Sequence, residues 1–265
     1  MPSIAVCVKP APADLNVHIS RRTGEPALEG VRFAINPWEK RAIALGIELV
    51  EKHGGSVTVV TMDEESSKMA LREALALGAD KAVLLTDKDF EGADTLATAR
   101  VLAAAVSKLR ADVVLTGSRT ADRRSAQVGP MVAQLLNIPA VTFVTEVAVD
   151  GKALRAKKRF GDRMATYQIP IPCLLSTSEE APKARIATAW GVADAFREKE
   201  IQVWNRRDLD LHEESVGREG SPTRVRRLEK VKEERRVQEC EFFEGDAEEI
   251  ARTFVRRLRA RGVVQ

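Results

Sequence analysis

The sequence has few of the residues that build disulfide frameworks or metal centres. It contains three cysteines and three histidines among 265 residues. None of them stands at the paired spacing of a thiolate or imidazole metal site. Cys7 and Cys173 lie inside apolar runs, where a thiol usually belongs to the core. We therefore expect neither a disulfide scaffold nor a metal centre.

Long hydrophobic runs are also missing. Apolar stretches such as residues 101–106 are far too short to span a bilayer. The first ten residues predict a strand and lack the basic segment that opens a signal peptide. We expect a cytoplasmic protein that is not integral to a membrane.

An excess of one charge is lacking as well. The chain carries 42 Lys and Arg against 39 Asp and Glu, for a formal net charge of +3, and only 5% of its residues are aromatic. Its densest charged run, residues 223–236, mixes both signs. Nucleic-acid binding favours a basic face with interleaved aromatic residues. We therefore expect no nucleic-acid partner.

Short apolar runs alternate with helical patterns through the first two-thirds of the chain. The runs predict strands at residues 4–8, 56–62, 81–86, 112–116 and 140–144, and the patterns between them predict helices at about 38–53, 64–77, 94–109 and 126–137. Glycines follow the first two helices at Gly54 and Gly78, where a left-handed residue is favoured. This rhythm predicts an α/β fold with a parallel sheet flanked by helices.

Two insertions and a C-terminal arm interrupt that rhythm. Residues 10–35 predict a hairpin or loop excursion, and residues 145–177 predict antiparallel strands at a sheet edge. Beyond residue 185 come a short helix, a strand at 201–204, a polar arm and a last helix at 246–261. Arms that bury little by themselves usually pack on a partner. We expect a nucleotide-binding domain at 1–185 and a partner-binding segment at 186–265.

The stretch after the fourth strand, residues 117–136, is the first candidate site. Gly117 allows close approach of a ligand, and Ser125 is a candidate N-cap for the following helix. The amides of Ala126, Gln127 and Val128 would then point outward with the helix dipole and suit a phosphate or diphosphate. The stretch is neither a P-loop nor a G-x-G-x-x-G motif. A glycine after a strand and a serine before a helix are also common where a strand ends and a helix begins without any ligand.

Other strand ends supply further candidates. Lys9 follows the first strand, and Asn36 is a candidate N-cap directly before the first helix. Trp38 either stacks on a base or belongs to the core. Ligands of open parallel sheets bind at the carboxyl ends of strands. If the first and fourth strands are neighbours, these segments surround one nucleotide.

Several segments resemble one family in order along nearly the whole chain. They are VCVKP, INPWEK, ALALGADKAVLL, DVVLTGSRTADRRSAQVGPMVAQLL and CLLSTSEEAPKAR. The sequence resembles the beta subunit of electron transfer flavoprotein. The resemblance implies an adenine-nucleotide alpha-hydrolase-like, Rossmann-like fold with a five-stranded parallel core. It also implies an alpha-subunit partner, FAD or AMP bound in this chain, and electron transfer between a dehydrogenase and quinone- or ferredoxin-linked partners.

The resemblance also implies the residues that contact the nucleotide. They are Cys7, Asn36, Met62 and the loop from Gly117 to Gly129, with Asp122, Ser125, Ala126, Gln127, Val128 and Gly129 in it. Lys9 is placed toward the flavin of the partner subunit, unless it is a solvated strand end. The redox chemistry belongs to the flavin, so we expect no catalytic residue in this chain.

The kind of nucleotide is indicated by two segments. SAQVGP at 125–130 and G-x-x-G-S-P-T at 217–223 are similar to relatives that hold two flavins, which include electron-bifurcating and nitrogen-fixation types. This favours FAD, while a single-flavin carrier with structural AMP stays open. The departure is Arg123-Arg124, where that group commonly has Gly-Asp. The two guanidinium groups either clamp a diphosphate or form a solvated loop tip.

The segment from Thr177 to Arg197 resembles the family's recognition loop for partner dehydrogenases. Its candidate docking residues are Glu179, Glu180, Lys183 and Arg185. Charged loops of this kind favour fast, salt-sensitive encounters. A universal-stress-type nucleotide-binding regulator shares the fold but is normally much shorter. An enzyme acting on a small substrate is disfavoured, because the sequence shows no triad or convergent acid pair.

Overall fold

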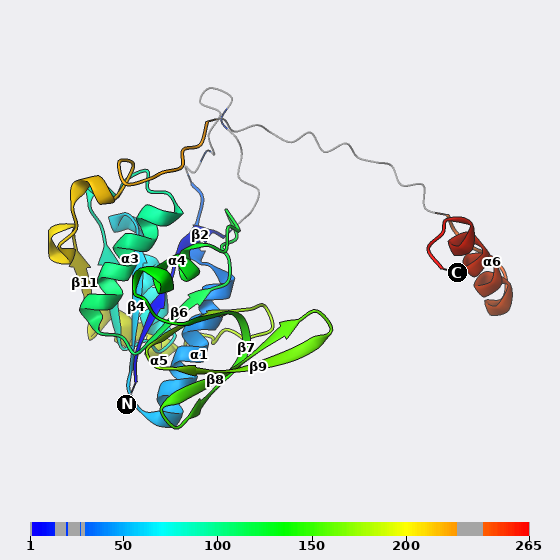
Figure 1. The fold of residues 1–265 in the computed structure, drawn as a ribbon, viewed down its shortest axis with the longest axis horizontal. Coiled ribbons are helices and arrows are strands. Elements are labelled where there is room, and N and C mark those ends of the chain that lie inside the picture. Colours follow the sequence, from blue (N-terminus) through cyan, green and yellow to red (C-terminus); the bar gives the residue numbers. More distant parts are fainter. Residues whose placement is uncertain (1, 14–19, 21–26, 28–29, 227–240, 265) are drawn as a thin grey trace. The chain divides into compact units, whose positions relative to one another are not determined.

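The computed structural model describes residues 2–13, 20, 27, 30–226 and 241–264 (Figure 1). His18 and Cys240 lie outside the described residues. The chain divides into two compact units, residues 1–228 and 229–265. The recognition segment and the strand after it are therefore part of the first unit. A division of function at residue 185 stays a prediction.

A nine-stranded sheet runs through the first unit, with β11 at one edge and the β8–β9 hairpin at the other (Figure 1). Its strand order is β11-β5-β4-β1-β6-β10-β7-β8-β9. The strands are β1 (Ser3–Cys7), β4 (Ser56–Met62), β5 (Lys81–Leu85), β6 (Val113–Gly117), β7 (Ala140–Asp150), β8 (Ala153–Phe160), β9 (Arg163–Pro170), β10 (Cys173–Thr177) and β11 (Ile201–Trp204). The pairings from β11 to β7 are parallel, which confirms the predicted fold class.

Helices cover both faces of this sheet. They are α1 (Pro37–His53), α2 (Lys68–Ala76), α3 (Thr95–Leu109), α4 (Val128–Leu135) and α5 (Ala189–Arg197), with 3-10 turns at Glu65–Ser67, Lys88–Phe90, Arg207–Leu209 and Glu213–Ser215. Helices α1, α2 and α5 contribute to one core, and α3 and α4 contribute to the other. These five helices of the first unit therefore form two layers around the sheet.

Alternation along each strand explains why both faces are covered. In β1, Ile4 and Val6 enter the core beneath α1, whereas Ala5 and Cys7 enter the core beneath α3. A strand that is buried on both faces has the near-continuous apolar run of a parallel sheet. The sequence shows that run, so the bounds of β1, β4, β5 and β6 could be predicted within one residue, whereas β7 continues to Asp150, beyond its predicted end at residue 144.

The edge beyond β7 is antiparallel, as predicted. β7 pairs with β8 and β8 with β9, through turns at Gly151 and Gly161 that both have φ of 63°. The prediction was wrong for the end of the 145–177 range. Strand β10 lies between β6 and β7 and is parallel to both, and all five of its residues are buried. Seven strands therefore make up the parallel part of the sheet, against the five implied by the resemblance.

The excursion after β1 begins and ends in a two-stranded antiparallel sheet. β2 (Pro10–Pro12) pairs with β3 (Phe33–Ile35), which agrees with the predicted hairpin at its two ends. The pairing brings the end of β1 beside the start of α1, and Asn36 N–H donates to the Lys9 carbonyl at 3.2 Å.

The second unit contains one described helix, α6 (Ala247–Ala260). Asp246 caps it by accepting hydrogen bonds from the N–H groups of Glu248 and Glu249, both at 2.9 Å. Phe243 packs edge-to-face on Phe254, with ring centroids 6.0 Å apart. No residue of α6 is buried, and Phe254 and Val255 remain 49% and 43% exposed.

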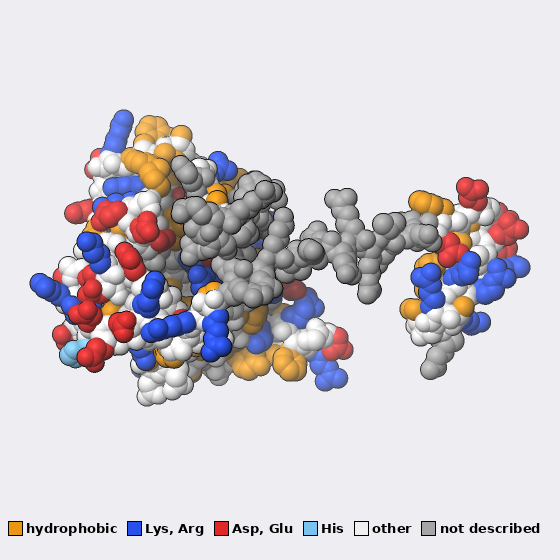
Figure 2. Space-filling view, turned by 90° about the horizontal axis from the view of Figure 1, so that it is seen from above, with side chains coloured by type: hydrophobic (Ala, Val, Ile, Leu, Met, Phe, Trp, Pro, Cys, Tyr) orange, Lys and Arg blue, Asp and Glu red, His pale blue; other side chains and the backbone are white. Residues whose placement is uncertain are grey.

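The surface of the first unit is mixed in charge. Figure 2 shows acidic and basic side chains interspersed over the visible face of this unit, which fits the small net charge. Within the described part of the chain, no helix combines the length and the apolar character that a membrane crossing requires.

Candidate functional site

An open cleft lies at the carboxyl ends of β1 and β6, where the strand order reverses. The two strands are parallel neighbours, from Ile4 beside Val113 to Cys7 beside Thr116. The cavity has a volume of about 520 Å³, within the range of small-molecule sites. Of the predicted contact residues, these line it: Cys7, Lys9, Met62, Gly117, Arg123, Ser125, Ala126, Gln127, Val128 and Gly129. Asn36, Asp122 and Arg124 do not line it.

Asn36 anchors the loop after β6 from behind. Its side chain is fully buried. The amide Nδ2 donates to the Arg119 carbonyl at 2.9 Å, and Oδ1 accepts from Ala121 N–H at 3.0 Å. Asn36 occupies the N-cap position of α1, as predicted, but its side chain makes no capping hydrogen bond. It is a loop anchor because its amide can bond a carbonyl and an N–H together.

Lys9, Asp122 and Glu39 form a charged group at the edge of the cleft. The Lys9 ammonium is paired with the Asp122 carboxylate, and Lys9 N–H donates to Glu39 Oε2. Burial raises the pKa of Asp122, but hydrogen bonds from Lys9 and Thr120 outweigh burial and keep that pKa below its ordinary value. Asp122 therefore acts as a charged partner that ties the loop to the end of β1.

Glu39 lines the cavity from the first turn of α1 and is only 6% exposed. Burial raises the pKa of its carboxyl from 4.5 to about 8, against the lowering effects of the Lys9 and Asn36 contacts. Burial and the neighbouring Glu39 also raise the pKa of the Cys7 thiol to about 12. Both groups are therefore neutral at pH 7 in the cleft.

The loop before α4 differs from the predicted cap. Ser125 is not the N-cap, because α4 begins at Val128 and Gln127 occupies that position. Arg124 and Ala126 have φ of 52° and 56°, a left-handed region that such residues rarely adopt. Two left-handed residues turn the chain before the helix starts. The amides of Val128 and Gly129 still open the helix at the cleft, and Pro130 lies in its first turn, where a missing N–H costs no hydrogen bond.

Two buried hydroxyl groups face this end of the cleft. Thr116 and Ser118 line the cavity and are 6% and 4% exposed. Among the residues that the structure describes, their side-chain oxygens have no hydrogen-bond partner. A side-chain carbon on Gly129 would lie 2.9 Å from Thr116 Oγ1, so glycine keeps this approach open. Buried hydroxyls usually have partners. With the first amides of α4, they fit the phosphates and adenosine that AMP and FAD share.

Gly117 is required by packing within the protein. A side-chain carbon there would lie 2.8 Å from Glu39 Cγ and 3.1 Å from Trp38 Cβ. Trp38 does not line the cavity, and the Arg119 guanidinium lies over its ring at 5.8 Å. The structure therefore places Trp38 behind the loop.

The Arg123-Arg124 pair is split by the turn. Arg123 lines the cleft, whereas Arg124 does not and takes the left-handed conformation. Of this pair, Arg123 alone is therefore in position to meet an anionic group in the cavity.

The G-x-x-G-S-P-T segment docks beside the cleft at the start of α3. Asp94 caps α3 by accepting from Leu96 and Ala97 N–H, and it also accepts from Thr223 N–H at 3.0 Å and Thr223 Oγ1 at 2.7 Å. In return, Asp94 N–H donates to Ser221 Oγ at 2.8 Å. Burial raises the pKa of Asp94, but these hydrogen bonds hold it below its ordinary value. The segment thus fixes residues 91–95, which form one wall of the cavity.

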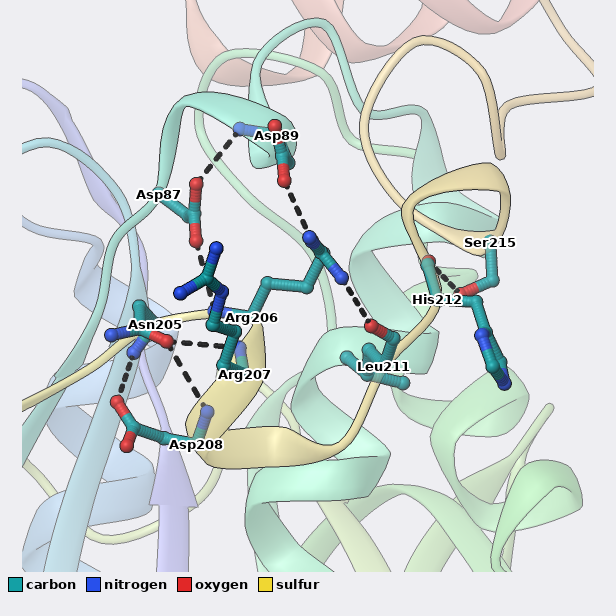
Figure 3. Close-up of polar contacts among 9 residues, drawn as sticks. All are labelled: Asp87, Asp89, Asn205, Arg206, Arg207, Asp208, Leu211, His212 and Ser215. Carbon is teal, nitrogen blue, oxygen red and sulfur yellow. Dashed lines mark hydrogen bonds and ion pairs between the residues drawn. The ribbon is translucent and has the colours of Figure 1, made fainter.

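A second polar cluster holds the turn after β5, whose Asp87 also lines the cavity (Figure 3). Arg206 N–H donates to Asp87 at 3.0 Å, its Nε donates to Asp89 at 2.6 Å, and its Nη1 donates to the Leu211 carbonyl at 2.8 Å. Arg206 therefore joins the turn after β11 to the turn after β5. Its contacts are made within the chain, which identifies it as a structural residue.

We expect Ser221→Ala to lower the free energy of unfolding by about 1–2 kcal/mol. The substitution leaves the Asp94 N–H without its acceptor and the Gly217 carbonyl without its 2.5 Å donor. Denaturant unfolding of the full chain measures the change. Ser215→Ala is the matched control, because its hydroxyl contacts only the His212 carbonyl, and we expect a change below about 0.5 kcal/mol. Equal losses in both variants would contradict the proposed role of Ser221 in holding Asp94 at the start of α3.

The predicted docking residues are exposed and mostly paired within the chain. Glu179 lies 3.8 Å from Arg119, Glu180 binds Arg159 in bidentate fashion at 2.8 and 3.0 Å, and Arg185 binds Glu51 at 2.7 Å. Lys183 is exposed. Exposed ion pairs contribute little to stability, so they can be exchanged for partners elsewhere.

Two apolar side chains in the same segment are far more exposed than its charges. Ile186 is 91% exposed and Trp190 is 86% exposed. Large apolar groups at such exposure commonly mark an interaction surface. The charges alone did not identify Ile186.

Sequence reasoning also missed three residues that line the cleft, Glu39, Thr116 and Asp94, and it did not single out Ser118 within the predicted loop. A signal was present for Glu39, since Asn36-x-x-Glu39 matches a capping box. The structure uses this glutamate differently, as acceptor of Lys9 N–H. Within the described residues, no group of three or more His, Cys, Asp and Glu is arranged to hold a metal ion.

Comparison with known proteins gives a consistent result. Residues 27–209 match the family model described as "Electron transfer flavoprotein domain". The chain is 37% identical to an electron transfer flavoprotein subunit beta of Thermoanaerobacterium thermosaccharolyticum, over 99% of this chain and 100% of that protein. It is 37% identical to the caffeyl-CoA reductase-Etf complex subunit CarD of Acetobacterium woodii, over 84% and 85%. It is also 37% identical to protein FixA of Azorhizobium caulinodans, over 85% and 83%.

Proposed function

The chain belongs to the electron transfer flavoprotein family, among its beta subunits, and we propose that it binds FAD in the β1–β6 cleft as half of a heterodimeric electron carrier. One observation carries the proposal. The cleft at the strand switch point combines the opening amides of α4 with two buried hydroxyls that lack partners, Thr116 and Ser118. These donors suit the phosphate and hydroxyl groups of a nucleotide.

The residues of this chain would bind and orient the nucleotide. The amides of Val128 and Gly129 face its phosphates, Arg123 supplies a cation, and the end of β1 and Met62 line the cavity for apolar contact. Asn36 holds the loop that carries these groups. Bound FAD supplies the redox chemistry through its ring system, and the protein sets the ring's surroundings.

The arrangement of the loop favours FAD over AMP. The SAQVGP residues line the cleft, and the G-x-x-G-S-P-T segment supports its wall through Asp94. Both segments resemble relatives with a second flavin, and both contribute to the same cavity. A single-flavin carrier with structural AMP is the second candidate, because AMP offers the same phosphate and adenosine.

An alpha subunit is the proposed partner of the second unit. Phe242 is 85% exposed there and Phe254 is 49% exposed. A helix that buries none of its own apolar side chains gains stability when another surface covers them. The name of the related caffeyl-CoA reductase-Etf complex subunit is consistent with such an assembly. We propose that residues 229–265 pack on the alpha subunit.

The recognition segment is proposed to dock dehydrogenases and other redox partners. We expect Trp190→Ala to weaken that association about tenfold or more, since exposed tryptophans frequently carry much of an interface's free energy. The free energy of unfolding should change by less than about 0.5 kcal/mol, because this indole is 86% exposed. Surface plasmon resonance against the partner dehydrogenase measures the affinity. Phe160→Ala, which truncates a 72% exposed aromatic beside the β8–β9 turn, should leave the affinity unchanged. Equal weakening in both variants would remove the recognition segment from the docking surface.

The nucleotide content of the complex tests the proposal. The chain is co-expressed with an alpha subunit, the complex is purified and denatured, and the released FAD and AMP are counted. Two FAD per heterodimer is the expected result and would make electron bifurcation worth testing. One FAD with one AMP would support the single-flavin alternative. A stable homodimer without flavin would favour a universal-stress-type regulator.

A further inference from the structure

The strongest feature that the proposed function does not explain is the acid on the wall of the cleft. Glu39 lines the cavity but is only 6% exposed, and Gly117 packs against its side chain. A carboxylate is an unexpected choice beside an anionic ligand, because two negative charges in a buried site repel each other.

The contacts around Glu39 do not neutralise a negative charge. The ammonium of Lys9 is paired with Asp122, so its charge is shared with another carboxylate. Lys9 N–H donates to Oε2, and the Asn36 amide lies close enough to interact. The groups that face the carboxyl are therefore Lys9 and Cys7 from the end of β1, Asn36 from its own helix, and Asp122 from the loop after β6.

We propose that Glu39 takes part in nucleotide binding as a neutral carboxylic acid that donates its O–H hydrogen to the bound nucleotide, so that binding keeps one proton on this chain. This inference rests on the proposed nucleotide site. A protonated carboxyl has one donor, whereas an ionised one has none. The phosphates and ring carbonyls of a nucleotide are acceptors, so only the neutral form complements them.

Among Glu39, Cys7 and Asp122, only Glu39 titrates near neutral pH. The pKa of the Cys7 thiol is raised to about 12 by burial, and the pKa of Asp122 is held below its ordinary value. The second phosphate pKa of a nucleotide monophosphate is near 6. Between about pH 7.5 and about pH 9.5, a change in the affinity for AMP therefore reports the ionisation of Glu39.

The test uses the full chain in complex with its alpha subunit, with nucleotide removed from the cleft and AMP as the probe. The dissociation constant is measured by calorimetry across that pH window, in buffers of different ionisation enthalpy. Since the pKa of Glu39 is about 8, wild-type affinity should fall about 20-fold across the window. In the upper half of this pH window, AMP binding should be accompanied by the uptake of most of one proton from solution.

Three variants test whether Glu39 donates a hydrogen bond to the nucleotide or only supports the structure of the cleft. Glu39→Gln retains an N–H donor and cannot ionise, so its affinity should match wild type near pH 7.5 and change less than about twofold across the window. Glu39→Ala should bind weakly at every pH. Glu48→Gln lies on the same helix, in an exposed pair with Lys52, and should behave as wild type.

Each outcome decides between the two proposals. The same pH dependence in wild type and Glu39→Gln would overturn the donor role, and so would a wild-type affinity that does not change with pH. AMP that fails to bind either protein while both remain folded would overturn the nucleotide site itself.

Discussion

Asn36→Ala is expected to lower the affinity for AMP or FAD about 100-fold, the largest loss we predict for a side chain outside the cavity. The substitution removes the acceptor of Ala121 N–H and the donor to the Arg119 carbonyl. Both groups belong to the loop that carries Arg123 and leads into the first amides of α4. Leaving such groups unpaired costs about 1–3 kcal/mol each, which also predicts a loss of unfolding free energy of that order.

Equilibrium binding of AMP to the nucleotide-free complex measures this effect. Asn36→Asp keeps the acceptor for Ala121 and loses the donor, so it should give an intermediate loss. Asn205→Ala is the matched control, because Asn205 is exposed and its carbonyl oxygen accepts two amides of a local turn at 2.9 and 3.2 Å. Undiminished affinity in a folded Asn36→Ala complex would show that the loop after β6 does not form the nucleotide site.

Glu39→Gln is expected to raise the stability of the nucleotide-free protein progressively with pH. The pKa of the folded-state carboxyl is about 8, above its ordinary 4.5, so folding favours the protonated form. The stability that this group contributes is complete below about pH 4.5 and is lost as pH rises through 8. Glutamine has no such loss. The difference should reach about 3–5 kcal/mol at alkaline pH, since one pKa unit corresponds to about 1.4 kcal/mol.

Denaturant unfolding at several pH values between 5 and 9 checks this sign directly. The gap between wild type and Glu39→Gln should widen upward from about pH 5 and become constant above about pH 8. Glu48→Gln should show no widening, because its carboxylate is exposed in a pair with Lys52. Parallel stability curves for wild type and Glu39→Gln would mean that Glu39 is ionised in the folded protein.

The strands and most helices could be predicted because their burial appears in the order of residues. β1 and β6 are apolar throughout, and a strand that is buried on both faces requires such a run. β10 is apolar in the same way, but it directly follows two antiparallel strands in the sequence. The sequence pattern therefore predicted it as part of the antiparallel edge. Its place between β6 and β7 depends on contacts distant in sequence.

The candidate site could be predicted in place but only partly in detail. The loop after β6 and the end of β1 meet as expected. Ser125 was assigned as a cap because serine favours that position. The chain instead turns through Arg124 and Ala126, whose backbones are left-handed. Neither arginine nor alanine predicts that conformation. The roles of Glu39 and Asn36 could not be predicted because both depend on what α1 packs against.

The cleft between β1 and β6 is proposed to hold an adenine nucleotide. Photolabelling of the complex with 8-azido-AMP, followed by peptide mapping, tests it most directly. We predict label on peptides that contain Cys7 to Lys9, Met62 or the loop from Gly117 to Pro130, and loss of that label in the presence of excess AMP. Label confined to other peptides, such as one that contains Asn205 to Arg207, would contradict this proposal.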